Sequence, residues 1–206
     1  MKYKIWYINL DYREDRRKQI EQELNNAGYI ENEHYTRVSG IHHVQGAIGC
    51  AKSHIECLKL ALNEKVDYAI IMEDDFVWKE DTKFVKQKIE MIMNKYEFDV
   101  FLLVASISGF QAQRMDQRNK FIHKVITAQA ATGYIITKKY IPKLIENFEN
   151  AVRILEQTGL KPLGAIDVTW KQLQAQDKWL MYIPGFAKQS ASFSDIEGID
   201  VNYEFV

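Results

Sequence analysis

The feature that most constrains the fold is an apolar run that ends in consecutive carboxylates. Residues 68–72 are mostly apolar, and Glu73, Asp74 and Asp75 follow them directly. An apolar run of this length predicts a buried strand, which is typical of sheets covered on both faces. In open α/β sheets, ligands bind at the carboxyl ends of the strands. We therefore expect the acids to lie at a ligand-binding edge of a sheet.

Neighbouring carboxylates repel one another unless a positive charge joins them, and a divalent cation is the usual solution. Alternate residues of an extended segment point the same way, so Glu73 and Asp75 are the expected metal ligands and Asp74 faces elsewhere. One alternative is an acidic turn with solvated side chains. Another is a single metal ligand, with the other acids capping the next turn. The preferred interpretation is a metal-dependent enzyme.

Composition limits the classes of function. The chain has 206 residues and only three prolines, and no segment resembles a linker, so we predict one domain over residues 1–206. A net charge of −1 argues against a broad electrostatic grip on nucleic acid or anionic membrane. No apolar run approaches the ~20 residues that span a bilayer, and the apolar start is too short for a signal-peptide core. We expect a cytoplasmic chain without a transmembrane segment.

The cysteines, Cys50 and Cys57, are too few for a disulfide framework. On one helix they would lie about 10 Å apart, beyond the roughly 7 Å that a disulfide allows, so we expect free thiols. With His54 they stand at positions i, i+4 and i+7, which would allow a metal-binding trio. Three ligands on one helix wrap a tetrahedron poorly and no fourth ligand is evident. A packed face with a hydrogen-bonded His54 is the preferred interpretation.

Patterning predicts strands that alternate with helices. Strands are expected at residues 3–9, 34–38, 68–72, 99–104, 121–126, 130–136 and 179–183, and helices at 11–27, 46–62, 82–94, 137–148 and 167–176. Residues 105–120 and the polar tail from Pro184 onward are expected to be loops that cover the site. This alternation predicts an α/β fold with a mostly parallel central sheet flanked by helices.

Several separated motifs occur in a distinctive order. They are INLDYREDRR at residues 8–17, GAIGCAKSH at 46–54, IIMEDD at 70–75, ATGYIIT at 131–137 and QSASFSDI at 189–196. In this order they resemble glycosyltransferase family 25, which contains bacterial lipooligosaccharide galactosyltransferases and collagen hydroxylysine galactosyltransferases. The similarity extends over residues 3–198.

The resemblance implies a GT-A-like fold, with donor binding in residues 1–105 and the acceptor and catalytic half in residues 106–206. It implies an inverting hexosyltransferase of glycan biosynthesis that uses UDP-galactose first and UDP-glucose second. The acceptor would be a hydroxyl of a glycan or of hydroxylysine, and the cofactor Mn²⁺ or Mg²⁺. One alternative is a catalytically idle family member that binds sugar or protein. Another is a hydrolase that uses the same metal.

For such a donor, the residues after the first strand form a natural nucleotide site. Asn9, Leu10 and Asp11 would line the uracil or ribose, and Asp74 would bond the ribose or the sugar. One of Arg13, Arg16 and Arg17 is expected to contact phosphate, since a forked guanidinium suits it. Arg13 is the first choice and Arg17 the second, and the alternative is a solvated helix face.

In the second motif, Gly46 allows close backbone approach at a helix start. Ser53 and His54 lie further along the same helix, and His54 is expected to buttress the donor site. The two residues are not a nucleophile pair, because adjacent helix residues point apart.

Inversion requires a base that takes the acceptor proton. The candidates are Asp167 and Asp195, with a slight preference for Asp167. The alternative role of Asp167 is the N-cap of the helix that follows it. Asp195 and Gln189 are expected to close over the donor or the metal.

Overall fold

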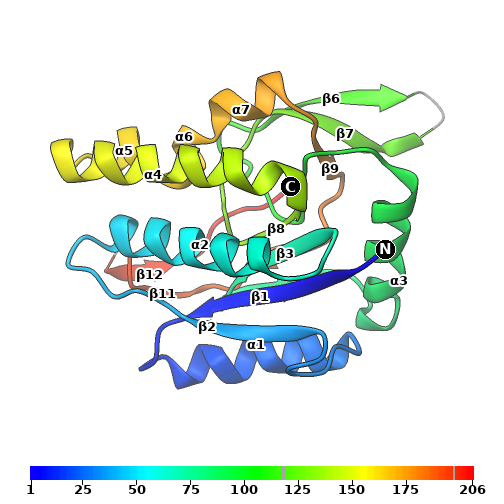
Figure 1. Ribbon diagram of the computed structural model, residues 1–206, viewed down its shortest axis with the longest axis horizontal. Helices are drawn as coiled ribbons and strands as arrows, with labels where there is room; N and C mark the ends of the chain where they lie inside the picture. Colours follow the sequence, from blue (N-terminus) through cyan, green and yellow to red (C-terminus); the bar gives the residue numbers. More distant parts are fainter. Residues whose placement is uncertain (117–118, 197) are drawn as a thin grey trace.

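The computed structural model describes residues 1–116, 119–196 and 198–206. Within them, a central sheet has the strand order β2-β1-β3-β8-β5-β9-β7-β6, with helices on both faces (Figure 1). Its strands are β1 (Tyr3–Asn9), β2 (Tyr35–Ser39), β3 (Tyr68–Glu73), β5 (Val100–Leu102), β6 (Gln111–Asp116), β7 (Asn119–Thr127), β8 (Gly133–Thr137) and β9 (Trp179–Tyr182). Two short ribbons pair β4 (Phe76–Trp78) with β10 (Ala187–Gln189) and β11 (Ser192–Ser194) with β12 (Ile199–Val201).

The longer helices are α1 (Glu14–Asn26), α2 (Gly46–Asn63), α3 (Thr82–Lys95) and α4 (Ile141–Thr158). A 3₁₀ turn (Lys138–Tyr140) precedes α4, and the short helices α5 (Lys161–Gly164), α6 (Ile166–Thr169) and α7 (Lys171–Gln176) follow it. No helix in the described ranges has the length and apolar character needed to cross a membrane.

The first part of the sheet is parallel. β1 pairs in parallel with both β2 and β3, and Ile8 stands opposite Glu73. The carboxyl ends of these strands therefore meet at one edge, where the acidic residues begin. β8 runs antiparallel to both β3 and β5, so the whole sheet is mixed. The predicted α/β class, with helices flanking a central sheet, is confirmed.

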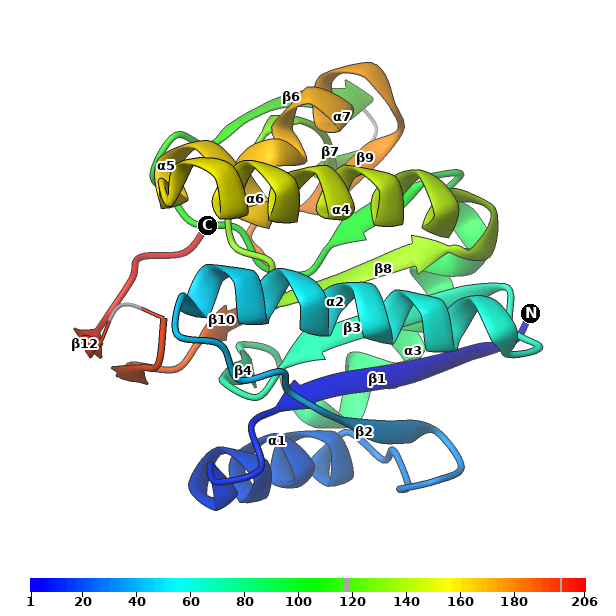
Figure 2. The same ribbon diagram turned by 60° about the vertical axis from the view of Figure 1, so that its left-hand side comes forward.

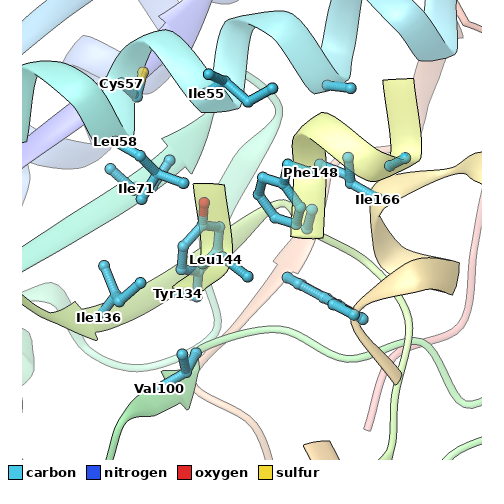
Figure 3. Packing of buried hydrophobic residues seen from close by; sticks show 14 of the residues in the cluster. Ile55, Cys57, Leu58, Ile71, Val100, Tyr134, Ile136, Leu144, Phe148 and Ile166 are labelled. Carbon is cyan, nitrogen blue, oxygen red and sulfur yellow. The ribbon is translucent and has the colours of Figure 1, made fainter. Parts of the chain in front are cut away.

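One face of the sheet is covered by α2 and α4, which lie side by side in Figure 2. Figure 3 shows Ile55 and Leu58 of α2 and Phe148 of α4 packed over Ile71 and Tyr134 of the sheet. These side chains are buried. Each apolar residue buried in this way contributes ~1.5–3 kcal/mol before chain entropy is counted. The other face packs on α1 and α3 through Ile20, Leu24, Val85 and Ile89.

The structure corrects several expected boundaries. Residues 105–120 were predicted to be a loop, but Gln111–Asp116 pairs with Asn119–Thr127 as a hairpin at the sheet edge. The side chains described in β6 are mostly exposed, so backbone pairing forms the strand without an apolar alternation to reveal it. Residues 117 and 118 lie outside the described residues.

Two further boundaries differ. The helix predicted to end at residue 148 continues to Thr158, because Ala151, Val152 and Leu155 extend its buried face. Gly159, at a φ of 68° that favours glycine, ends it. The tail predicted to be a loop contains β10, β11 and β12. Both cysteines are free, as expected.

Candidate active site

A cleft opens at the carboxyl ends of β1 and β3. It is lined by residues 8–10, Tyr12 and Arg16, the loop 40–43, the start of α2, all three acids of residues 73–75, and the tail residues 189 and 194–196. The centres of water-sized molecules can occupy a volume of about 140 Å³ within it.

The acids divide between two sides of the cleft. Arg16 Nη1 lies 3.1 Å from Asp74 Oδ1 and 3.4 Å from Asp75 Oδ2. Glu73 Oε1 instead faces α2, where His54 Nε2 lies 3.2 Å away and Cys50 Sγ 3.6 Å away. The expected convergence of Glu73 and Asp75, with Asp74 apart, is not what the hydrogen bonds show. The chain turns after Glu73, the last residue of β3, so the alternation of an extended strand ends there.

Burial is the largest single influence on the pKa of each of these acids, and it opposes their ionisation. Burial, and then the charge of Glu73, raises the pKa of Asp75 to about 8. Burial also raises the pKa of Asp74, although Asn9 and Arg16 favour its charged form. Burial works against ionisation of Glu73 as well, but the hydrogen bond and charge of His54 keep the pKa of Glu73 below its usual value. The cleft therefore has an excess of acid that favours a bound cation.

The two oxygens of the Asp75 carboxylate differ in their hydrogen bonding. Gln189 Nε2 donates to Asp75 Oδ2 at 2.7 Å. Asp75 Oδ1 is buried and has no hydrogen-bond partner in the part of the chain that the structure describes. A buried carboxylate oxygen without a partner is costly, and metal coordination is one way to satisfy it.

The residues after β1 have different positions. Asn9 is buried, donates to Asp74 Oδ2 at 2.8 Å and accepts from Arg37 Nε at 2.9 Å. Leu10 lines the cleft beside it. Asp11 lies outside the lining, where it accepts hydrogen bonds from Arg37 and from Ser39 Oγ. Two of the three predicted nucleotide contacts therefore face the cleft.

Arg16, and not the preferred Arg13 or Arg17, is the arginine that lines the cleft. Arg13 pairs with Asp15 and Asp195, and Arg17 forms an exposed ion pair with Glu21 at 2.8 Å. Neither lines the cleft, whereas Arg16 does. A signal was present, because Arg16, Ile20 and Leu24 recur at a spacing of four residues and share the buried face of α1.

The second motif shapes the opposite side. A Cβ atom added to Gly46 would lie 2.9 Å from the Cα of Ile196, so glycine lets the tail approach the start of α2. Ser53 Oγ accepts from the backbone N–H of Ile41 at 2.8 Å and donates to the Gly49 carbonyl at 2.7 Å. It thereby anchors the loop that lines the cleft.

His54 is fully buried and stacks on Tyr134, with ring centroids 5.8 Å apart. Its Nδ1 lies 3.1 Å from Tyr134 Oη. The sequence favoured a packed, hydrogen-bonded His54, and the structure agrees with this prediction. Cys57 is buried in the apolar core (Figure 3).

The candidate bases have different surroundings. Asp195 accepts from Tyr12 Oη at 3.0 Å and from Arg13, and it lines the cleft. Asp167 lies outside the lining, where its Oδ2 accepts from the Ala130 N–H at 3.1 Å. Ala165 is the N-cap of α6, so the alternative role of Asp167 as an N-cap is wrong. Burial raises the pKa of Asp167, and the charge of Glu73 adds to this effect.

Comparison with solved structures identifies the fold of the chain that carries this site. UDP-glucose pyrophosphorylase complexed with UDP-glucose is 11% identical, with a TM-score of 0.56 over 92% of each chain. A197 from STIV is 17% identical, with a TM-score of 0.51 over 88% of this chain and 81% of that one. Mannose-1-phosphate geranyltransferase from Thermus thermophilus is 10% identical, with a TM-score of 0.52 over 90% of this chain and 75% of that one. At these identities the likeness shows the fold alone, which is GT-A-like.

Comparison with protein families identifies the chain more closely. No curated protein matches it. Residues 30–158 match the family described as "Glycosyltransferase family 25 (LPS biosynthesis protein)". The match covers more than half of the chain and includes the second, third and fourth sequence motifs and all three acids. This protein therefore belongs to glycosyltransferase family 25 and is a glycosyltransferase.

Proposed function

We propose that the protein is an inverting, metal-dependent hexosyltransferase. It moves galactose, or secondarily glucose, from a UDP-sugar to a hydroxyl of a glycan or hydroxylysine acceptor. The observation that carries this proposal is the Asp75 carboxylate, which is buried in the cleft with Oδ1 unpartnered among the described residues.

The acids fit a hard divalent cation such as Mn²⁺ or Mg²⁺, because both prefer oxygen ligands. Asp75 supplies the unpartnered oxygen, and Glu73 lines the same cleft. Arg16 faces both Asp74 and Asp75, so its single charge leaves negative charge to be balanced. When bound, such a cation neutralises the diphosphate leaving group as charge develops on it.

The donor side is proposed at the ends of the parallel strands. Nucleotides bind there in α/β folds, and a structure with a similar fold was solved with UDP-glucose. Asn9 and Leu10 are the proposed nucleotide contacts, and Asp74 the proposed ribose or sugar contact. Arg16 is the guanidinium nearest to a bound donor, whereas Arg13 holds the tail through Asp195.

The proposed base is Asp167, which lies outside the cleft lining but near enough to Glu73 for that charge to raise its pKa. Its pKa is raised by burial, so it holds a proton more readily than an ordinary aspartate. The carboxylate of Asp195 is already bound by Arg13 and Tyr12. These contacts suit Asp195 to closing the cleft, together with Gln189.

The test is calorimetric binding of UDP-galactose and UDP-glucose, with Mn²⁺ and with EDTA. Asp75→Asn should reduce metal-dependent binding at least tenfold. Asp81→Asn is a matched control, because Asp81 caps α3 outside the cleft and asparagine caps equally well. If neither donor binds under any condition, the UDP-hexose assignment is wrong and the idle, sugar- or protein-binding alternative replaces it.

A further inference from the structure

Three side chains with different metal-binding atoms meet at the cleft. Cys50 Sγ, a ring nitrogen of His54 and a carboxylate oxygen of Glu73 all lie within 4.8 Å of one another. We propose that Cys50, His54 and Glu73 form a binding site for Zn²⁺, separate from the hard-cation position at Asp75. This site goes beyond the proposed function, because its occupancy requires neither donor nor acceptor.

Two of the three ligand separations match a tetrahedral centre, and the third, between Cys50 and His54, is within 4.8 Å. With Zn–N and Zn–O bonds of about 2.1 Å and a Zn–S bond of about 2.3 Å, adjacent N and O ligands lie about 3.4 Å apart, and S and O ligands about 3.6 Å apart. The observed separations are 3.2 Å for His54 Nε2 to Glu73 Oε1 and 3.6 Å for Cys50 Sγ to Glu73 Oε1. Small side-chain adjustments therefore place all three atoms around one ion.

Three ligands on a single helix surround a tetrahedral ion poorly, but these three ligands come from two elements. Cys50 and His54 are one turn apart on α2, but Glu73 comes from the end of β3. Ligands from two elements surround an ion better than three from a single helix. All three side chains line the cleft, so a fourth coordination position is open to water or a ligand.

Tyr134 provides the outer contact that metal-binding histidines usually have. Its hydroxyl lies 3.1 Å from His54 Nδ1, and the two rings stack. When Nδ1–H donates a hydrogen bond to the Tyr134 hydroxyl oxygen, the Nε2 lone pair is left to bind the ion on the side of Glu73. Such a partner fixes the ring orientation and the tautomer of a metal-binding histidine.

The donor set favours zinc over manganese. Thiolate and imidazole ligands suit Zn²⁺, whereas Mn²⁺ and Mg²⁺ suit carboxylate and water. Burial, and then the charges of Glu73 and Asp167, raise the pKa of the Cys50 thiol. A bound cation offsets that cost, so binding releases the thiol proton to solvent as the S–metal bond forms.

Cobalt reports sulfur ligation directly. The metal-free full chain is titrated with Co²⁺, and we expect a sulfur-to-cobalt charge-transfer band that saturates at one Co²⁺ per chain and disappears when Zn²⁺ is added. Cys50→Ser should lose the band. Cys57→Ala is the matched control, because Cys57 is on the same helix but in the core, and it should keep the band. Glu73→Gln should weaken Co²⁺ binding at least tenfold, which tests the site if Cys50→Ser lacks the native circular dichroism spectrum.

Asp75→Asn separates this proposal from the proposed function. It should weaken metal-dependent donor binding at least tenfold and keep the charge-transfer band. The zinc site is overturned if the wild-type chain shows no band, if the band persists in Cys50→Ser, or if natively folded Cys57→Ala loses it. Loss of the band in natively folded Asp75→Asn would show that the two metal positions are one, which also overturns it.

Discussion

The two walls of the cleft are built differently. The inner wall is formed by the cleft-lining residues of β1, β3 and α2 and the acids that follow β3. Its Asn9, His54 and Asp74 side chains are almost fully buried. The outer wall is residues 189–196, where Phe193 and Ile196 are 47% and 41% exposed. The inner wall is part of the core, whereas the outer wall is attached to its surface.

The attachment of the outer wall is mainly polar. Arg13 pairs with Asp195, Arg16 Nη2 donates to the Phe193 carbonyl at 2.6 Å, and Gln189 donates to Asp75. Partly exposed contacts of this kind contribute little to global stability. Because the charged groups of the inner wall are buried, their charge state affects the stability of the fold. The outer wall, by contrast, can move while the fold stays intact. Changes in the inner wall should alter stability, and changes in the outer wall should alter ligand binding.

The largest effect should come from Arg16→Met. Arg16 is the cation beside buried Asp74 and Asp75, and its loss removes the positive charge that favours the ionised form of both acids. We expect the free energy of unfolding to fall by about 3 kcal/mol in urea denaturation at pH 7. The matched control is Arg17→Met, which breaks an exposed pair with Glu21 and should cost about 0.5 kcal/mol. Equal losses would contradict the assigned burial of Arg16 against the two acids of the inner wall.

The second effect is a pH dependence that Asp75 controls. Its pKa is about 8 in the folded protein, against an ordinary value of 3.8 for an aspartate. The native state therefore binds more protons than the unfolded state between these values, and stability falls as pH rises through that window. Without metal, Asp75→Asn should raise the free energy of unfolding at pH 8 by at least about 1 kcal/mol and flatten this slope.

Added Mn²⁺ provides the control for that prediction. An ion that binds only the folded state stabilises it, so Mn²⁺ should stabilise the wild-type protein at pH 8 and leave Asp75→Asn nearly unchanged. A wild-type stability that rises steadily from pH 4 to pH 8 in EDTA would contradict the assigned burial of Asp75.

The inner wall was largely predictable from the sequence because its signals are local. The apolar residues 68–72 predicted β3, and the acids that follow it lie at the cleft. Apolar spacing likewise predicted α2 within one residue of its observed end at Asn63. The direction of each acid was not predictable, because the chain turns after Glu73. Arg16 was predictable in principle from its spacing to Ile20 and Leu24.

The outer wall was only partly predictable because its contacts join distant parts of the chain. Gln189 and Asp75 are separated by 114 positions, and Arg13 and Asp195 by 182. The order of the motifs indicated that residues 189–196 close over the site, but no local pattern gave their partners. The β6–β7 hairpin was missed for a related reason, since polar strands held by backbone pairing carry no apolar period.

The third effect should come from Gly46→Ala, which acts where the two walls touch. The new Cβ atom would lie 2.9 Å from the Cα of Ile196. The exposed outer wall can shift more easily than α2, so the free energy of unfolding should change by less than about 1 kcal/mol. Calorimetry should show UDP-hexose binding weakened about tenfold, or about 1.4 kcal/mol. A loss of stability larger than the loss of binding would show that the outer wall belongs to the core.

The smallest effect on stability should come from Asp195→Asn, which removes the ion pair with Arg13 and keeps the side-chain size. A partly exposed pair contributes about 0.2–1 kcal/mol, so global unfolding should hardly change. Opening of the outer wall should become up to about fivefold more frequent, measured as faster limited proteolysis within residues 189–196. Asp15→Asn is the matched control, because Asp15 also pairs with Arg13, at 2.9 Å, but lies on α1. Faster cleavage in Asp195→Asn alone would show that this pair closes the cleft. Unchanged cleavage in both would mean that the outer wall is held by packing, and the contrast between the walls would then be one of exposure only.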